Sequence, residues 1–282
     1  MSMSNYLLRT VVCVWLAGCG LGAVGAQASP GAPTQRPDVA SESDGERAGE
    51  LVVGVRHVVP PFVAGSKVRT PENIETLLVD EVAKSMQRTP RYIAADASSS
   101  SVSPETFDFV VADLPKGSPP VFPSMTAIAT GQVTRPMAIM RTDTDIKSWT
   151  QLKGRTVCLA EDGKYVGKIA QQYGAIEQVY RAPADSLLAL RIGECDAAVH
   201  DDTMLKALLR FPEWKKFSAS LPPGNASAQY FLVPAQRKEL ANRLRKLVAG
   251  WQSKGYYGKL IADMTHDIAF EVYLDQTVPD CH

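Results

Sequence analysis

The stretch Gly193–Asp202, GECDAAVHDD, holds groups that could do chemistry: a cysteine near its start and two carboxylates at its end. A turn at Gly193 followed by a short apolar run predicts a buried strand. Carboxylates at the end of a buried strand are tolerated only where the strand reaches solvent. We therefore expect Asp201 and Asp202 to lie at a solvent-filled edge of a sheet.

The segment EDGKYVG offers groups that could bind an anion. Gly163 opens a predicted turn into a helix, so the unpaired amides of Lys164 and Tyr165 would lie in the first helical turn. Such amides bind anions, and the helix dipole strengthens the interaction. An ordinary turn from a strand into a helix is the alternative reading of the same residues.

Histidines suggest a second chemistry. His57 follows the first predicted strand, His200 precedes Asp201, and Asp113 adds a second carboxylate, so a cleft could present these groups to a metal ion. Asp113, His200 and Asp201 could also transfer protons in a small-acid dehydratase or lyase. With four histidines in the chain, coincidence is the simpler explanation. We expect no metal, no cofactor and no enzymatic activity, because no Ser/His/Asp, Cys/His or paired-carboxylate spacing supports catalysis.

Strands and helices alternate along the part of the chain that carries these residues. The alternation predicts an α/β architecture with mostly parallel sheets. The last amphipathic helix has its apolar positions between Leu240 and Trp251, and Gly255 is predicted to end it. Apolar runs predict strands at 51–55, 107–114, 135–140, 154–160 and 195–199, and helical spacing predicts helices at 71–87, 164–173 and 186–192.

The composition is that of an ordinary globular protein. The chain has 282 residues, of which 45% are hydrophobic and 21% charged, enough to bury one large or two medium cores. Thirty basic and thirty acidic residues cancel. A nucleic-acid partner would require a concentrated basic face, so we expect none.

Residues 1–28 have the form of an export signal, with one arginine, an apolar stretch and then small residues. LAGC at Leu16–Cys19 resembles the lipobox of bacterial lipoproteins, in which Cys19 would be lipidated and membrane-anchored. AQA before Ser29 suits the ordinary signal peptidase, and a buried helix is a third reading. We favour the lipoprotein. Residues 29–50 lack apolar periodicity and are predicted to form a disordered tether.

Several stretches, taken in order, resemble the periplasmic solute-binding proteins of the polar-amino-acid type, which are binding subunits of ABC importers. LVVGVRHVVPPF is similar to that family's first strand and Pro-Pro-Phe loop, and TLLVDEVAKSMQ to its first helix, including Asp80. DIKSWTQLKGRTVCLAEDG resembles the entry to the second lobe, and LLALRIGECDAAVHD the helix, strand and acid that follow. KGYYGKL resembles the end of the last long helix. Together these stretches cover most of Leu51–Asp263.

The resemblance implies a two-lobe periplasmic-binding-protein fold, also called a Venus flytrap, with a two-crossing hinge. Lobe 1 would comprise 51–139 and 234–282, and lobe 2 would comprise 140–233. The ligand would lie in the cleft, at the carboxyl ends of the strands, where open α/β sheets bind ligands.

The implied function is capture of a small polar solute, an amino acid or related amine, for the membrane subunits of an ABC importer. The protein would be periplasmic and monomeric, and it would bind its solute without catalysing a reaction. A sensory or accessory protein with a degenerate pocket is a further alternative.

The resemblance also implies roles for individual residues. Asp201 would project into the cleft and hold the ligand's ammonium group through a charge-assisted hydrogen bond. Asp202 would be a solvated helix N-cap, although capping by both acids is the alternative. The other implied ligand-binding residues are Asp113, Gly163, Lys164, Tyr165, Phe62 and Arg135.

The family's carboxylate-binding arginine is missing from the matching stretch VVADLPKGSPPVF. Lys116 or Arg135 could replace it, although lysine forms a poorer fork for a carboxylate. Asp113 stands where a small neutral residue is expected. Because an unbalanced buried charge is costly, these departures predict a ligand that is cationic or dipolar.

Export makes Cys158, Cys195 and Cys281 candidates for disulfide bonds. Family members often carry one cysteine in the strand after LKG and another just before the DA strand, as Cys158 and Cys195 do here. The resemblance therefore implies a disulfide between these two, with two buried thiols as the alternative, and leaves Cys281 unpaired.

Overall fold

A computed structural model describes residues 49–61, 63–95, 105–117 and 124–277 of the chain. The expectations for the export signal, for Cys19, Phe62 and Cys281, and for nearly all of the tether concern residues outside these ranges. They remain predictions.

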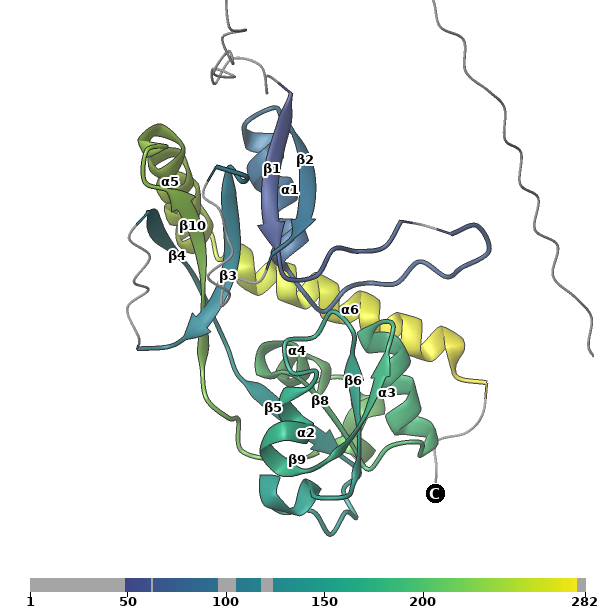
Figure 1. The fold of residues 1–282 in the computed structure, drawn as a ribbon. Coiled ribbons are helices and arrows are strands. Elements are labelled where there is room, and N and C mark those ends of the chain that lie inside the picture. The colour runs from purple at the N-terminus through teal and green to yellow at the C-terminus, as the bar shows by residue number, and fades with distance from the viewer. Residues whose placement is uncertain (1–48, 62, 96–104, 118–123, 278–282) are drawn as a thin grey trace, which may run out of the picture. The chain divides into compact units, whose positions relative to one another are not determined.

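The first of two five-stranded sheets has the strand order β2-β1-β3-β10-β4 (Figure 1). β1 pairs in parallel with β2 and β3, whereas β10 pairs antiparallel with β3 and β4. Because β10 runs against its neighbours, the sheet is mixed rather than mostly parallel. The strands are β1 (Glu50–Val55), β2 (Thr89–Ala94), β3 (Phe109–Pro115), β4 (Met125–Thr134) and β10 (Ser227–Pro234).

The second sheet has the order β7-β6-β8-β5-β9. β6 pairs in parallel with β7 and β8, and β5 pairs antiparallel with β8 and β9, so this sheet is mixed as well. The α/β prediction is confirmed, and the expectation of mostly parallel sheets is wrong. The strands are β5 (Pro136–Met140), β6 (Thr156–Ala160), β7 (Ile176–Tyr180), β8 (Ala197–Asp201) and β9 (Ala219–Ser220).

Helices cover both sheets, and several begin at other residues than predicted. α1 (Glu75–Ser85) is shorter than the predicted helix, and the Asn73 side chain accepts a hydrogen bond from the Glu75 amide at its start (2.8 Å). α2 (Lys168–Tyr173) begins only after Gly167, whose φ of 78° is left-handed. The remaining helices that cover the second sheet are α3 (Pro183–Ile192), α4 (Asp202–Leu208) and the short 3-10 turns η1 (Trp149–Leu152) and η2 (Pro212–Phe217).

α5 (Lys238–Ser253) is not the last helix, contrary to the prediction. Gly255 adopts a left-handed φ of 63°, and the chain then continues as α6 (Tyr256–Asp275). α6 packs against α3, α4 and α5 and is drawn in yellow in Figure 1. The buried residues Met264, Ile268 and Val272 have the helical spacing that could have revealed α6 in the sequence.

The chain passes from the first sheet to the second between β4 and β5, and returns between β9 and β10. Both passages precede the crossings expected at residues 139–140 and 233–234, which lie inside or at the end of strands. We call the part built on the first sheet lobe 1 and the part built on the second sheet lobe 2. α6 follows lobe 1 in sequence, yet it packs on α3 and α4 of lobe 2.

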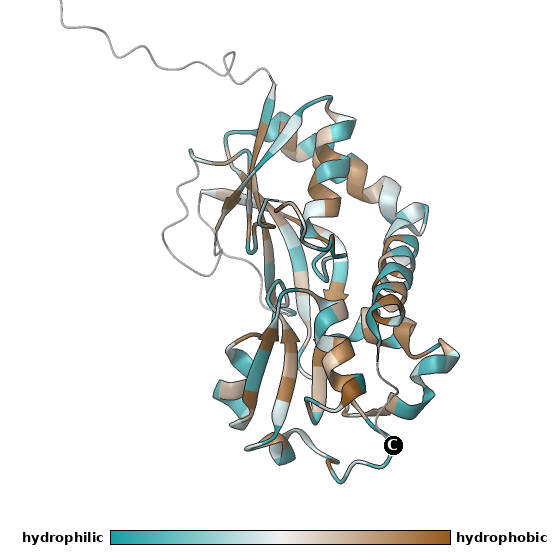
Figure 2. Ribbon diagram, turned by 90° about the vertical axis from the view of Figure 1, so that its right-hand side faces the viewer, coloured by the Kyte–Doolittle hydropathy of each residue, from teal (hydrophilic) through white to brown (hydrophobic). Residues whose placement is uncertain are grey.

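Apolar residues concentrate along the strands of both sheets (Figure 2). One buried cluster joins β1, α1 and α5 to α3, α4 and α6, including Phe109, Trp214, Phe231 and Ile268. Cys158 in β6 and Cys195 before β8 form a disulfide with a Cα–Cα distance of 5.8 Å, which confirms that pairing. Within the described ranges, no helix has the length and apolar character needed to cross a membrane.

Candidate ligand-binding site

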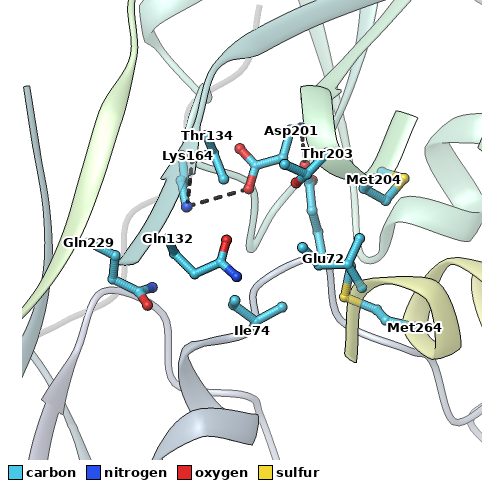
Figure 3. Close-up of a pocket in the computed structure, with 11 residues that line it drawn as sticks. Glu72, Ile74, Gln132, Thr134, Lys164, Asp201, Thr203, Met204, Gln229 and Met264 are labelled. Atoms are coloured by element: carbon cyan, nitrogen blue, oxygen red, sulfur yellow. Dashed lines mark hydrogen bonds and ion pairs between the residues drawn. The ribbon is translucent and has the colours of Figure 1, made fainter. Parts of the chain in front are cut away.

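Polar side chains from both sheets meet where strands end. Asp113 lies near the carboxyl end of β3, Thr134 ends β4, and Asp201 ends β8. Lys164 lies in the turn that follows β6. Figure 3 shows Lys164, Thr134 and Asp201 directed toward one another. The edge formed by strand carboxyl ends is the usual ligand site of open α/β sheets.

The Lys164 ammonium is surrounded by oxygen atoms from both lobes. Its Nζ atom lies 3.2 Å from Asp113 Oδ1, 3.1 Å from Thr134 Oγ1 and 3.3 Å from Asp201 Oδ2. Burial by itself would lower the pKa of Lys164, but the carboxylates of Asp201, Asp113 and Glu75 raise it overall. Lys164 is therefore a charged ammonium held inside the cleft.

The Asp201 carboxylate is held from two directions. The hydroxyl of Tyr165 donates a hydrogen bond to Asp201 Oδ1 (2.5 Å), while Oδ2 faces Lys164. Burial raises the pKa of Asp201 against the lowering effect of Lys164. Asp201 occupies the N-cap position of α4, but its side chain makes no capping bond and points to the cleft instead.

Asp202 is buried, which corrects the expectation of a solvated N-cap. It is the first residue of α4, and its Oδ1 accepts a hydrogen bond from the Arg135 amide (2.9 Å). Its Oδ2 accepts one from Lys206 (2.6 Å), and the Arg135 guanidinium lies 3.8 Å away. Arg135 is therefore engaged with Asp202 and does not line the cavity.

Glu72 joins a lobe 1 loop to β8 of lobe 2. Glu72 Oε1 accepts a hydrogen bond from the Asp201 amide and Oε2 lies 2.7 Å from His200 Nδ1. The other ring nitrogen of His200 is 2.8 Å from Ser186 Oγ. This chain of serine, histidine and glutamate has the order of a hydrolase triad, but Ser186 and His200 are completely buried. A substrate cannot reach the buried serine. Because Glu72 belongs to lobe 1 and His200 and Ser186 belong to lobe 2, these contacts link the two lobes.

Arg56 forms a second link between the lobes. Its guanidinium donates to Asp162 O (2.5 Å) and Gly163 O (3.1 Å), both in the turn after β6. Asp162 Oδ2 in turn accepts a hydrogen bond from the Asn73 amide (3.1 Å). Burial and the neighbouring Glu72 raise the pKa of Asp162 to about 6. The turn that carries Lys164 is thus fixed to lobe 1 by backbone and side-chain contacts.

Glu75, at the start of α1, is a buried acid near these groups. Its Oε2 accepts a hydrogen bond from the Arg56 amide (3.1 Å), but Oε1 is buried without a partner among the described residues. Burial, together with the negative charge of Asp113, raises the pKa of Glu75 to about 7. Glu75 therefore changes its charge near neutral pH.

The loop that carries Glu72 is held against α6. The amide and hydroxyl of Thr70 donate to Glu271 Oε1 (2.9 and 2.6 Å). The Arg69 guanidinium pairs with Asp185 of α3 (2.5 Å) and with Asp275 of α6. These contacts explain how a loop of lobe 1 places its acid against β8.

The cavity left between these side chains is small. Its volume is about 10 Å³, close to the minimum for one water molecule. Asp113 Oδ2 and Gln229 Nε2 are buried and have no hydrogen-bond partner among the described residues. The lining residues are Glu72, Ile74, Gln132, Thr134, Lys164, Asp201, Thr203, Met204, Gln229, Ile261 and Met264.

The predicted site residues fall into two groups. Asp113, Lys164, Tyr165 and Asp201 come together, and Gly163 contributes a carbonyl that binds Arg56. Arg135 lies elsewhere, Lys116 is exposed, and Phe62 is outside the described residues. Lys164 and Tyr165 precede α2 rather than forming its first turn, so the expected helical anion site is not formed.

Sequence reasoning missed Arg56, Glu72, Glu75 and Asp162. A charged residue directly after a buried strand, as Arg56 is, was the available signal. Glu72 falls inside the helix predicted at 71–87, where an acidic residue gives no signal of a site. Within the described ranges, no three or more His, Cys, Asp or Glu side chains are grouped so that they could hold a metal ion.

Three solved structures illustrate what the chain is similar to. A mutant of ArgBP from T. maritima has 17% identity and a TM-score of 0.51, and the match covers 77% of this chain and 95% of that one. An ancestral cationic amino acid solute binding protein, AncCDT-1, has 16% identity and a TM-score of 0.51, covering 78% and 96%. The substrate binding protein of an amino acid ABC transporter has 20% identity and a TM-score of 0.49, covering 77% and 99%.

No protein-family model matches the chain, and no curated protein matches it significantly by sequence. At these low identities the structural matches establish the fold and nothing finer. The two mixed sheets, their connecting passages and the matches at a TM-score of 0.51 agree. The chain has the two-lobe α/β fold of periplasmic binding proteins.

Proposed function

We propose that the chain is an exported, non-enzymatic solute-binding protein that captures a small polar solute, an amino acid or related amine, for an ABC importer. One observation carries the proposal: carboxylates from both lobes, Asp113 and Asp201, converge on a single ammonium group. Charge-assisted hydrogen bonds of this kind are the strong interactions by which a protein holds an amine.

The similar solved structures include binding proteins for amino acids, which supports this proposal. AncCDT-1 is described as a cationic amino acid solute binding protein, and the carboxylates of the present cleft suit a cationic group. The importer as partner rests on the sequence resemblance described above. The proposed protein acts as a monomer and needs no cofactor, because holding and releasing a solute requires only the two lobes.

Native mass spectrometry of protein purified without dialysis tests this function. We expect an added mass that corresponds to one small amine per chain and that disappears when the same sample is denatured. A chain without added mass, even after incubation with mixed amino acids and amines, would favour the accessory protein with a degenerate pocket. Conversion of an added acid into a product, without a persistent adduct, would favour the dehydratase.

The proposed location is the periplasm, with a lipid anchor on Cys19. Replacing Cys19 by serine should release the protein from the membrane fraction into the soluble periplasmic fraction, because the lipid is attached through the thiol. Cys13→Ser is the matched control, since this cysteine lies in the same apolar segment outside the lipobox. Membrane association that is unchanged in Cys19→Ser would contradict the anchor and favour cleavage before Ser29.

A further inference from the structure

Lys164 lies where a bound cation would lie in the cleft. Its Nζ atom has three oxygen atoms within 3.3 Å, from Asp113, Thr134 and Asp201. An ammonium group has three N–H donors and no acceptor, so these oxygens match its full requirement. They belong to β3 and β4 of lobe 1 and to β8 of lobe 2. One ammonium therefore joins the two lobes.

The geometry points to Lys164 as an internal ligand. In the solute-free protein its ammonium occupies the cation subsite and joins the lobes there, alongside the links made by Glu72 and Arg56, and a solute binds by replacing it with a primary ammonium of its own. The inference rests on the proposed solute-binding function for its biological purpose. The contacts of Lys164 with Asp113, Thr134 and Asp201 support it independently of that function.

The space in the cleft supports displacement rather than binding beside the lysine. The cavity of about 10 Å³ is too small for any amino acid while the Lys164 side chain is in place. The side chain of Lys164 is only 10% exposed, so it fills the centre of the site rather than its rim. A solute must therefore move this side chain before it can contact Asp113 and Asp201.

The charges around the cleft explain why the closed state requires a cation. The carboxylates that gather there in the described part of the chain are Glu72, Glu75, Asp113, Asp162 and Asp201. The Arg56 guanidinium donates its hydrogen bonds to two backbone carbonyls and to none of these carboxylates. Breaking a buried ion pair leaves the remaining charge uncompensated and is strongly destabilising. Only a cationic replacement can therefore take the place of Lys164 in the closed cleft.

An internal competitor also sets the affinity of the site. The apparent dissociation constant rises by the inverse of the fraction of molecules whose site is free. A tethered ammonium has a high effective concentration, so weakly binding amines are excluded. Neutral and anionic solutes are excluded because they cannot replace its ion pairs.

Chemical rescue tests the inference with a defined probe. Lys164→Ala removes the side chain beyond Cβ, and n-propylammonium has the three carbons and the ammonium that are then missing. We expect n-propylammonium to bind Lys164→Ala at least about tenfold more tightly than wild type in calorimetry, because the competitor is gone. It should also raise the thermal unfolding midpoint of the variant. n-Propanol, which has the same shape without the charge, should do neither.

Second substitutions identify the carboxylate. Adding Asp201→Asn to Lys164→Ala should weaken n-propylammonium binding at least about thirtyfold, the effect of removing one partner of a desolvated pair. Asp202→Asn is the matched control, since Asp202 is also buried but bonds to Arg135 and Lys206. It should leave the rescue unchanged. Equal binding of the probe to wild type and Lys164→Ala, or equal rescue by n-propanol, would overturn the inference.

A second variant applies if Lys164→Ala does not fold. Lys164→Gln keeps most of the side-chain volume and removes the charge, so the solute-free variant should have a larger radius of gyration than wild type in small-angle scattering. An unchanged radius would refute Lys164 as a contact that closure requires in addition to the Glu72 and Arg56 links. The outcomes separate the two proposals: rescue by n-propylammonium without any solute adduct on wild type would support the internal ligand and contradict solute delivery.

Discussion

Replacing Cys158 and Cys195 together by alanine should lower the free energy of unfolding by about 3 to 4 kcal/mol. The two cysteines are 37 residues apart in sequence, and closing a loop of that length removes about this much entropy from the unfolded chain in the chain-entropy model. The double variant avoids a lone thiol that could form a wrong bond. Denaturant unfolding followed by circular dichroism measures the difference.

Cys281→Ser is the control for this experiment, because Cys281 has no place in the observed disulfide. It should leave the unfolding free energy within about 0.5 kcal/mol of wild type, because the Cys158–Cys195 disulfide stays intact. Addition of a reductant should destabilise wild type and leave the double alanine variant unaffected. A double variant as stable as wild type would show that the disulfide does not stabilise the folded protein.

Replacing Glu75 by glutamine should stabilise the protein at high pH and remove part of its pH dependence. Burial and Asp113 raise the pKa of Glu75 from 4.5 to about 7. Between these two values the folded protein binds more protons than the unfolded chain, so the free energy of unfolding falls as the pH rises through this interval. A shift of this size corresponds to about 3 kcal/mol. Glutamine stays neutral and avoids that loss.

The measurement compares Glu75→Gln with wild type at pH 4.5 and at pH 8. We expect the difference in unfolding free energy to favour the variant by about 3 kcal/mol more at pH 8 than at pH 4.5. Arg56 and Lys164 lower the pKa of Glu75 in part, and burial and Asp113 outweigh them. Glu213→Gln, at an exposed position, is the control and should show no such difference. A difference that does not vary with pH would contradict a raised pKa at Glu75.

Local patterns in the sequence were enough to predict the class of fold and several of its elements. The apolar runs at 51–55, 135–140 and 195–199 became β1, β5 and the start of β8, because a run of buried residues reports burial directly. The strands β2, β4, β7, β9 and β10 were missed. All but β10 lie at sheet edges, and β2 and β7 have many exposed positions, whereas β10 lies between β3 and β4. Edge strands bury fewer side chains, so their apolar pattern is weaker.

The site shows the limit of local reasoning more clearly. The sequence predicts ligand-binding roles for Asp113, Lys164 and Asp201. For Lys164 the predicted group is the backbone amide, whereas the structure places its side-chain ammonium in the cleft. A spacing pattern reports which face of an element is buried. It carries no information on which distant charge will lie opposite, so the pairing of Lys164 with both acids followed only from the tertiary structure.

Glu72 and α6 illustrate the same division over longer distances. The Glu72 carboxylate accepts a hydrogen bond from the Asp201 amide, 129 residues away in sequence, because a loop held to α6 carries it there. The spacing of the apolar residues in α6 indicates that one of its faces is buried. It does not indicate that this face packs on α3 and α4 of lobe 2. The sequence by itself predicted the α/β class, several elements and the kinds of charge present, and the family resemblance implied the disulfide. The three-dimensional path of the chain decided which charges meet, because electrostatic energy depends on distance in space.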